Sequence, residues 1–391
     1  MKLALCLEYP IDQSGGTEVL VSELIRGFGS RHKVLLVSPD NRESLAKSPL
    51  AGCIGEHISW PLTGVTVARS RNLAEQLARA KVDLVHFHFG GNYAWNNRAF
   101  RQCPVVHLKK HGIPCLATNH GAFSILEGYC WHARPWWMKL ALLPPAWLSK
   151  QYVLRALAVE VAVSQHDFHA LRRWYPPMRG KFRWIYHSRI HETAPPPPNP
   201  NRRKTVLCAG TIGPRKGQTF LTEAFGRIAP RFPDWQLLLL GRHADPGMTS
   251  QIREFIARQR LEGQIQMPGP CTDEELRDHL KCSAIFAMPS LFEGLGLSLQ
   301  EAQFYGCACV GTRCGGVEDL IQDGDNGLLV AAGKVAPLAA ALEKLMGDAQ
   351  LRERFSRRAP QSVLEKNMTA AAMVAAYERL YVEILQAAKS H

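Results

Sequence analysis

The sequence predicts an α/β protein made of two doubly wound domains that face each other across a cleft. Its 391 residues exceed what one hydrophobic core usually serves. In both halves, short apolar runs alternate with longer amphipathic ones, which is the rhythm of a parallel sheet wrapped by helices. Between the halves lies APPPPNPN, residues 194–201, which suits neither a helix nor a central strand. The content of 46% hydrophobic and 21% charged residues is that of an ordinary globular protein.

The first half carries several predicted strands and helices in alternation. Short apolar runs predict strands over residues 2–7, 33–38, 83–89, 115–121 and 158–164. Apolar spacing of three and four predicts helices over residues 16–28 and 72–81. We assign residues 1–194 to a first domain and residues 195–201 to a proline-rich linker.

The same alternation restarts after the linker. Strands are predicted over residues 205–210, 235–241, 264–269, 284–290 and 307–312. Helices are predicted over residues 218–230, 248–261 and 273–283, and another follows Glu293. We assign residues 202–370 to a second domain and residues 371–391 to an amphipathic helix, which by analogy with known folds, rather than from its own pattern, is expected to finish the second domain and pass back toward the first. The carboxyl ends of parallel sheets bind ligands, so a nucleotide-sized ligand is expected in the cleft.

The charge of the chain favours an anionic partner. The net charge is +13 and the sequence pI about 9.3, which suits nucleic acid, an acidic membrane face or a phosphorylated ligand. The lysines and arginines are scattered, and neither a zinc finger nor an RNA-binding signature occurs. We therefore expect no nucleic-acid partner.

The cysteines indicate a reducing, cytoplasmic location. Their number is odd, 11, and Glu8 ends the first apolar run too early for a secretory signal. Cys307, Cys309 and Cys314 lack the paired spacing of zinc ligands, so we expect small buried side chains and no metal. The apolar stretch PWWMKLALLPPAWL is shorter than a membrane span and contains two adjacent prolines. No span is predicted.

Glu293 and Glu301 stand at the two ends of EGLGLSLQE, which leads from a predicted strand through a glycine loop into a helix. Glycines let the backbone approach a ligand, and free amides at a helix start suit phosphate oxygens. We interpret the two carboxylates as hydrogen-bond acceptors for hydroxyl groups at the two ends of one bound ligand. The alternative is that Glu293 complements the helix dipole and Glu301 is a solvated helix residue.

The segment CAGTIGPRKGQTF places glycines and two cations in the loop after the first strand of the second domain. Arg215 and Lys216 among glycines suit a diphosphate, whose charge they would neutralise as it leaves. The order Lys216-Gly217 is the reverse of the one in a Walker loop. The alternative is a solvated turn with incidental charges.

Two weaker signals lie in the first domain. Gly15 and Gly16 precede a helix, where amides can meet phosphate or let an acceptor approach. His120 follows a strand in ATNHG, where a neutral imidazole can hold a sugar hydroxyl. A structural role for His120 remains about equally open.

These segments together resemble the retaining glycosyltransferases of family 4, which have the GT-B fold of two facing Rossmann-like domains. The resemblance covers nearly the whole chain. It is carried by EGLGLSLQE after PS, by GTIGPRKG, by CGGVEDLIQDGDNGLLV, and by GGTE, TNHG and AVS, all in the expected order. The domain of residues 1–194 would then bind the acceptor, and that of residues 202–370 the nucleotide sugar.

The resemblance also implies roles for single residues. Glu293 and His120 would contact the donor sugar, and Glu301 the ribose hydroxyls. Arg215 and Lys216 would bind the diphosphate, without a metal or other cofactor, and Gly16 would lie near the phosphates or the acceptor. The donor site would also include the loop and helix-start residues Gly210, Gly294, Leu295, Gly296 and Leu297.

The chain departs from the family pattern in three places. Thr211 stands where the family often has an arginine, His187-Ser188 where many members have Asn-Gly, and Glu318 where a proline commonly precedes the acid that is Asp319 here. None of these departures removes an expected catalytic group. The identity of the nucleotide and of the sugar stays open.

The expected activity is transfer of a sugar from a nucleotide diphosphate sugar to a glycan or lipid-linked acceptor, with retention, in polysaccharide, lipopolysaccharide or glycolipid synthesis. A sugar-nucleotide epimerase and a catalytically degenerate partner subunit are the alternatives. A nicotinamide dehydrogenase is a poorer candidate because no G-x-G-x-x-G follows the first strand of either domain.

Residues 129–152 mix tryptophans with lysines and an arginine. They suit contact with an anionic membrane surface, which would place the protein peripherally at the inner face of the cytoplasmic membrane. A helix pair packed on the first domain is the equal alternative.

Overall fold

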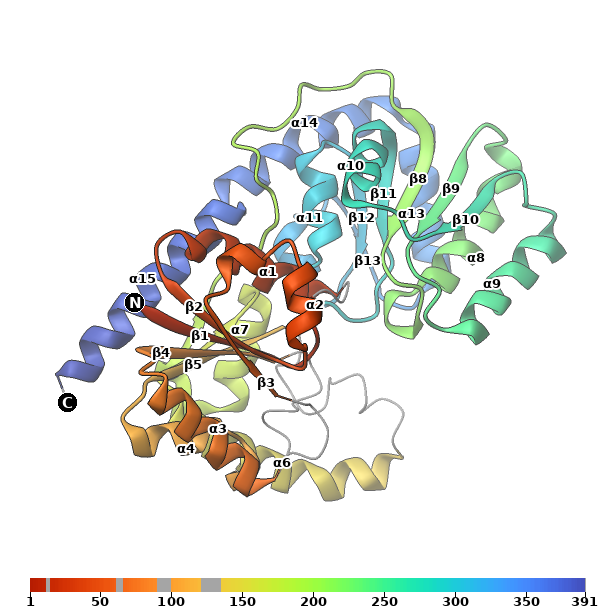
Figure 1. The fold of residues 1–391 in the computed structure, drawn as a ribbon. Coiled ribbons are helices and arrows are strands. Elements are labelled where there is room, and N and C mark those ends of the chain that lie inside the picture. The colour runs from red at the N-terminus through yellow and green to blue at the C-terminus, as the bar shows by residue number, and fades with distance from the viewer. Residues whose placement is uncertain (12–14, 61–65, 90–99, 121–134, 391) are drawn as a thin grey trace. The chain divides into compact units, whose positions relative to one another are not determined.

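The computed structural model describes residues 1–11, 15–60, 66–89, 100–120 and 135–390. It divides into two compact units: Met1–Arg189 together with Ala370–His391, and Ile190–Thr369 (Figure 1). The chain therefore crosses between the units twice. The first crossing follows Arg189, whereas the linker was predicted at residues 195–201. The second crossing precedes Ala370, close to the predicted start of the final helix at residue 371.

The first unit is built on a parallel sheet of seven strands in the order β3-β2-β1-β4-β5-β6-β7. The strands are β1 (Lys2–Leu7), β2 (Lys33–Ser38), β3 (Glu56–Ser59), β4 (Leu84–Phe89), β5 (Cys115–Asn119), β6 (Val159–Ala162) and β7 (Phe182–Trp184). The central strands are almost wholly buried because helices cover both faces of the sheet, and among their apolar residues β4 also buries His86 and His88.

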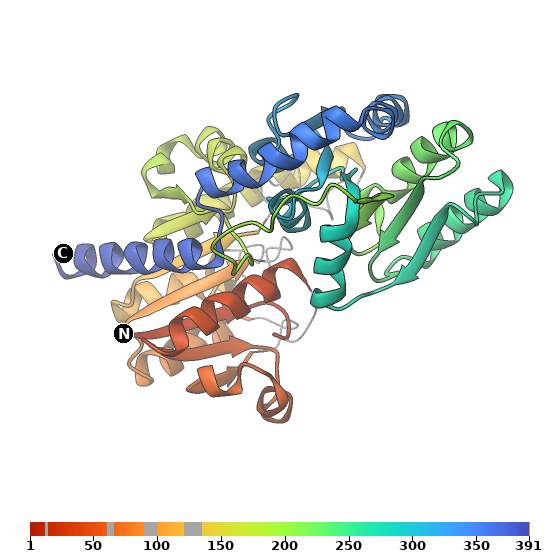
Figure 2. The same ribbon diagram turned by 90° about the horizontal axis from the view of Figure 1, so that it is seen from above.

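The helices of this unit follow the strands in alternation and include the last helix of the chain. They are α1 (Gly16–Gly29), α2 (Arg42–Lys47), α3 (Val67–Arg79), α4 (Val105–Leu108), α6 (Trp136–Ala156), α7 (Gln165–Trp174) and α15 (Ala370–Lys389). Helix α15 runs beside α1 (Figure 2), and a Cβ on Gly27 would lie 2.6 Å from Val374. The absent side chain at Gly27 is what allows this close packing.

The second unit has a parallel sheet of six strands in the order β10-β9-β8-β11-β12-β13. The strands are β8 (Arg203–Ala209), β9 (Gln236–Leu240), β10 (Ile265–Gly269), β11 (Ser283–Met288), β12 (Ala308–Thr312) and β13 (Gly327–Val330). The helices are α8 (Gln218–Ile228), α9 (Pro246–Gln259), α10 (Asp273–Cys282), α11 (Leu297–Phe304), α12 (Val317–Leu320), α13 (Val335–Gly347) and α14 (Ala349–Glu365).

Both sheets reverse their strand order at one point, between β1 and β4 in the first unit and between β8 and β11 in the second. The connections on the two sides of such a point leave in opposite directions, which opens a crevice at the carboxyl ends of the strands. The predicted class, two doubly wound α/β domains, is confirmed. The two switch points are where ligand-binding residues are expected within each unit.

Three local predictions were incomplete or wrong. The edge strands β3 and β7 were missed because they are short and largely exposed, so they carry no continuous apolar run. The helices α2, α4, α7, α13 and α14 were also missed. Residues 136–156 form one helix rather than a pair, with Pro144 and Pro145 inside it, although each interior proline removes a helical hydrogen bond. Within the described ranges, no helix is both long and apolar enough to cross a membrane.

Candidate active site

The loop after β8 is held against the end of β11 by its backbone. It forms a short 3-10 turn, Pro214–Lys216, and then Gly217 with φ +65°. A Cβ on Gly217 would lie 2.1 Å from the carbonyl oxygen of Pro289, and Leu291 N–H donates to the carbonyl of Arg215 at 2.8 Å. Only glycine permits this approach. The loop that carries Arg215 and Lys216, here called the cation loop, therefore meets the loop of residues 289–296, here called the Glu293 loop, at the switch point of the second sheet.

Glu293 connects the two loops through its carboxylate. Its side chain is buried, and Oε1 accepts hydrogen bonds from Lys216 Nζ at 2.6 Å and from Ser290 Oγ at 2.8 Å. Its Oε2 accepts from Arg215 at 3.3 Å, and the same guanidinium nitrogen donates to the carbonyl of Phe292 at 3.1 Å. One carboxylate thus orients both cations of the loop.

The charge state of Glu293 follows from these contacts. Burial opposes ionisation, but the nearby charges of Lys216 and Arg215, with the hydrogen bonds from Lys216 and Ser290, hold the pKa of Glu293 at about 2. The carboxylate is therefore ionised at neutral pH. Because two cations share one anion, the cluster keeps a net positive charge that suits a phosphate group.

Helix α11 begins next to this cluster. Gly296 has φ +98° and precedes the helix without a side-chain cap, and Ser298 Oγ donates to the carbonyl of Ala209 at the end of β8 at 3.1 Å. Gly294 and Leu295 form the loop, and Leu297 is the first helical residue. The start of α11 is thus fixed at the carboxyl end of β8, with backbone amides left for a ligand.

Glu301 lies on the second turn of α11 and is 5% exposed, as is Glu293. The alternative in which Glu301 is a solvated helix residue is therefore wrong. The alternative for Glu293 also fails, because its carboxylate is bound by Lys216 and lies before the helix rather than in its first turn. Gly210, at the end of β8 with φ +153°, lies beside the Lys216 side chain.

Residues after β12 support the Glu293 loop, a contribution that the sequence reasoning missed. A Cβ on Gly315 would lie 1.9 Å from the carbonyl oxygen of Glu293, and one on Gly316 would lie 2.2 Å from that of Gly294. Thr312 Oγ1 and Cys314 Sγ both donate to the carbonyl of Ser290. The adjacent glycines in CGG were the available signal, because such pairs mark close backbone approach.

The cation loop itself is closely packed. A cavity of only about 10 Å³ lies beside Lys216, between the ends of β8 and β11. Gln218 fills the turn, because its Nε2 donates to the carbonyls of Gly210 and Thr211 at 3.3 and 3.2 Å. A ligand would therefore lie over the loop rather than inside it.

The remaining predicted residues belong to the first unit. Gly16 is the first residue of α1, and a Cβ there would meet nothing within 4 Å, so the position does not require glycine for steric reasons. His120 directly follows β5 and contacts His88 on the neighbouring strand, with 3.1 Å between His120 Nε2 and His88 Nδ1. Desolvation lowers the pKa of His120 to about 3, so its ring is neutral.

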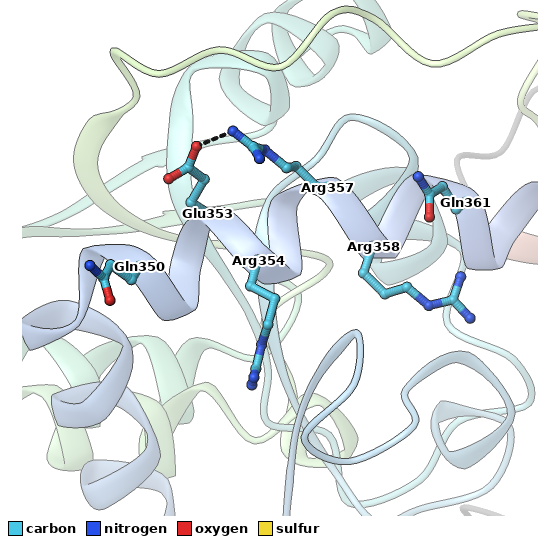
Figure 3. A pocket seen from close by; sticks show the side chains of 6 residues that line it. All are labelled: Gln350, Glu353, Arg354, Arg357, Arg358 and Gln361. Carbon is cyan, nitrogen blue, oxygen red and sulfur yellow. Dashed lines mark hydrogen bonds and ion pairs between the residues drawn. The ribbon is translucent and has the colours of Figure 1, made fainter.

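A surface hollow of about 310 Å³ lies on α14 of the second unit, and none of the predicted site residues lines it (Figure 3). Its arginines are already engaged: Arg357 pairs with Glu353, Arg358 with Asp325, and Arg354 donates to the carbonyl of Gly324. We interpret it as a solvated helix face. In the part of the chain that the structure describes, no three or more His, Cys, Asp or Glu side chains are arranged so that they could hold a metal ion.

Both units match known protein families. Residues 190–362 match the family described as glycosyl transferases group 1, and residues 14–188 match glycosyltransferase family 4. The two models together span most of the chain, and each follows one compact unit.

Individual relatives and solved structures agree with these matches. The chain is 29% identical over 383 residues to the phosphatidyl-myo-inositol mannosyltransferase of Mycolicibacterium smegmatis, covering 93% of this chain and 89% of the relative. It is 28% identical over 150 residues to the lipopolysaccharide core biosynthesis mannosyltransferase LpsB of Rhizobium meliloti, covering 37% and 42%. Anabaena HepE, solved with UDP and glucose, superposes with a TM-score of 0.76 at 16% identity over 98% of this chain and 100% of that one.

Proposed function

Since this chain belongs to the group 1, family 4 glycosyltransferases of the GT-B fold, we propose that it transfers a sugar from a nucleoside diphosphate sugar to an acceptor hydroxyl with retention at the anomeric carbon, and without a metal. The sugar transfer follows from the family. The retention of configuration at the anomeric carbon and the absence of a metal requirement are tested by the experiments below. The main support is the group formed by Glu293, Arg215, Lys216 and Ser290, here called the Glu293 cluster.

The Glu293 cluster suits a leaving diphosphate. Lys216 and Arg215 are oriented by one buried carboxylate, at the switch point where α8 and α11 also begin. When the bond between the anomeric carbon and the phosphate oxygen breaks, negative charge develops on that oxygen. Preorganised cations and helix-start amides stabilise such charge without reorganisation.

The proposed step balances without a co-reactant. The acceptor oxygen forms the new bond to the anomeric carbon from the face that the diphosphate leaves, and a phosphate oxygen takes the acceptor proton. Glu293 is ionised and engaged by two cations, so it orients these groups and the sugar and does not act as the acid. Glu301 is proposed to bind the ribose hydroxyls.

Turnover of a Lys216 variant tests this role. Lys216→Met is expected to lower kcat by roughly 10²-fold, the usual loss when one preorganised stabilising group is removed. Lys204→Met is the matched control, because Lys204 lies in the same unit and its ion pair with Asp234 is exposed. Proton NMR of the product gives the anomeric configuration, and EDTA treatment tests for a metal. An inverted product, or loss of activity restored by a divalent ion, contradicts the proposal.

The donor base can be identified by thermal shift. UDP, GDP and ADP are each compared on the wild type and on Glu301→Ala. A ligand at about 100 times its dissociation constant adds roughly 2.7 kcal/mol of stability. We expect one nucleotide to stabilise the wild type and the shift to be lost in the variant. A shift retained in full by the variant removes Glu301 from the ribose site.

We also propose that α6 contacts an anionic membrane surface that holds a lipid-linked acceptor. Trp136 is 73% and Trp137 57% exposed, and Leu140 and Leu148 are exposed on the same helix. Tryptophans at a membrane interface bury apolar rings at headgroup depth. Two relatives bear the names of a glycolipid and a lipopolysaccharide enzyme. The predicted segment began at residue 129, and residues 129–134 lie outside the described residues. Lys150, one of the cations expected to face lipid, is instead buried and paired with Glu160.

Flotation with anionic liposomes tests the surface. The wild type is expected to float at low salt and the variant Trp136→Ser/Trp137→Ser to stay at the bottom. Trp184→Ser is the control, because Trp184 is exposed on β7 rather than on α6. Equal flotation of all three proteins contradicts the proposal.

The epimerase alternative finds no support, because the matched families and the relatives named above are transferases. Incubation of the protein with the donor alone should therefore yield no epimer.

A further inference from the structure

Four histidine rings gather at the centre of the first unit, and only one of them, His120, is expected from the sequence to contact the donor sugar. His86 and His88 lie on one side of β4, His120 follows β5, and His187 follows β7. The ring centroids of His86 and His88 are 3.9 Å apart, those of His88 and His120 5.4 Å, and those of His120 and His187 5.1 Å. We call these four residues the histidine cluster.

A row of hydrogen bonds ties this cluster to the last helix. Tyr381 and Tyr377 of α15 bond to His86 Nδ1 and His187 Nε2, each at 2.7 Å. Thr118 Oγ1 joins the row in the middle, at 2.7 Å from His86 Nε2 and 2.8 Å from the Tyr377 hydroxyl. The three inner members, His86, Thr118 and Tyr377, each donate one hydrogen bond and accept one, and the end members Tyr381 and His187 each make one, so all four bonds can form with every ring neutral.

The rings of the cluster are kept neutral. Burial, reinforced by the other rings, holds the pKa values of His86, His88 and His187 well below the usual range. The bond between His88 Nδ1 and His120 Nε2 therefore contains a single proton. One ring donates and the other accepts, and this choice sets the tautomer of His120.

The burial of His88 decides the direction of that bond. Its Nε2 is fully buried and has no partner among the described residues. If His120 donated, His88 would carry its proton on this Nε2 as an orphaned buried N–H. If His88 donates, its Nε2 is a bare acceptor, which buried structure tolerates better. Donation from His88 Nδ1 to His120 Nε2 is therefore favoured.

We propose that His88 is a positioning residue that holds His120 in its neutral Nδ1–H tautomer, with a fixed ring orientation. His120 then presents Nδ1–H as a hydrogen-bond donor at the carboxyl end of β5. A donor suits a sugar hydroxyl oxygen, and this part of the inference rests on the proposed function. The tautomer itself does not depend on it.

The ring nitrogen spectrum of His120 tests the tautomer directly. In protein labelled with 15N-histidine at pH 7, the signals of His120 are assigned by their absence in His120→Gln. We expect a protonated Nδ1 and a bare Nε2 in the wild type. His88→Leu should lose this pattern, and His88→Asn should keep it because its amide places a donor near the position of Nδ1. A protonated Nε2 in the wild type, or an unchanged pattern in folded His88→Leu, overturns the proposal.

Kinetics separate this inference from the proposed function. We expect kcat to fall by about 10-fold in His88→Leu with KM changed less than twofold, and most of kcat to return in His88→Asn. If the spectrum is as expected but His120→Gln retains full activity, the role of His120 in sugar binding fails and the positioning by His88 stands. If KM rises and kcat is unchanged, the positioning role in catalysis is refuted.

Discussion

Replacing Lys216 with methionine tests the electrostatics of the Glu293 cluster independently of activity. Glu293 titrates near 2 rather than near 4.5, which corresponds to about 3 kcal/mol of preference for the ionised form in the folded state. Lys216 Nζ lies at 2.6 Å and Arg215 at 3.3 Å, so we assign the larger part, about 2 kcal/mol, to Lys216. Methionine keeps the length of the side chain and removes the charge.

The expected loss of stability is about 2 kcal/mol at pH 7, because a buried carboxylate loses its nearest partner. The depressed pKa of Glu293 adds stability above pH 4.5 that is lost as the pH falls toward 2. The difference between wild type and variant should therefore shrink as the pH is lowered from 4.5.

Calorimetry is the suitable assay, because two units give more than one transition and a single unfolding free energy is not defined. The transition assigned to the second unit should move, and that of the first should not. Lys204→Met, which breaks an exposed ion pair in the same unit, should move neither. An equal shift in both variants, or a Lys216→Met shift that is independent of pH below 4.5, refutes the reasoning.

Three further predictions concern stability. The histidine cluster is neutral when folded and charged when unfolded at acid pH, so the first unit should lose up to about 1.4 kcal/mol per pH unit for each histidine below pH 6.5; a flat profile in acid titration calorimetry would contradict this. Gly217→Ala should cost more than about 2 kcal/mol in the second transition, because the new Cβ meets the Pro289 carbonyl at a positive φ, whereas Gly213→Ala, in open space, should be nearly neutral. Tyr377→Phe removes two buried hydrogen bonds and should cost about 2 kcal/mol in the first transition; a loss below about 0.5 kcal/mol is incompatible with the bonding described.

The order of strands and helices could be read from the sequence where apolar runs are long. EGLGLSLQE was correctly placed as a loop leading into a helix, because glycines punctuate the end of a strand. Edge strands escaped detection because half-exposed residues such as those of β7 have no clear period. The periodicity of α15 was visible, but nothing local shows which sheet such a helix covers.

Contacts between distant residues were beyond the sequence. Lys216 and Glu293 were both singled out, but as ligands of different parts of a donor rather than as partners, because 77 residues separate them. The run DLVHFHF predicted a strand, and the two histidines on one face gave no indication of a cluster. The hydrogen-bond partner of His86, Tyr381, is 295 residues away, and only the closed fold brings the two together.

The double crossing of the chain has a consequence for biosynthesis. The second unit, Ile190–Thr369, is continuous and is complete while α15 is still untranslated. The first unit begins earlier but cannot close until the last helix supplies the hydroxyls of Tyr377 and Tyr381 to its buried histidines. During synthesis the second unit can therefore fold before the first, whereas amino-terminal domains generally fold first. A chain that stops after Thr369 would contain the whole second unit, but its first unit would lack the Tyr381 and Tyr377 hydroxyls that bond His86 and His187.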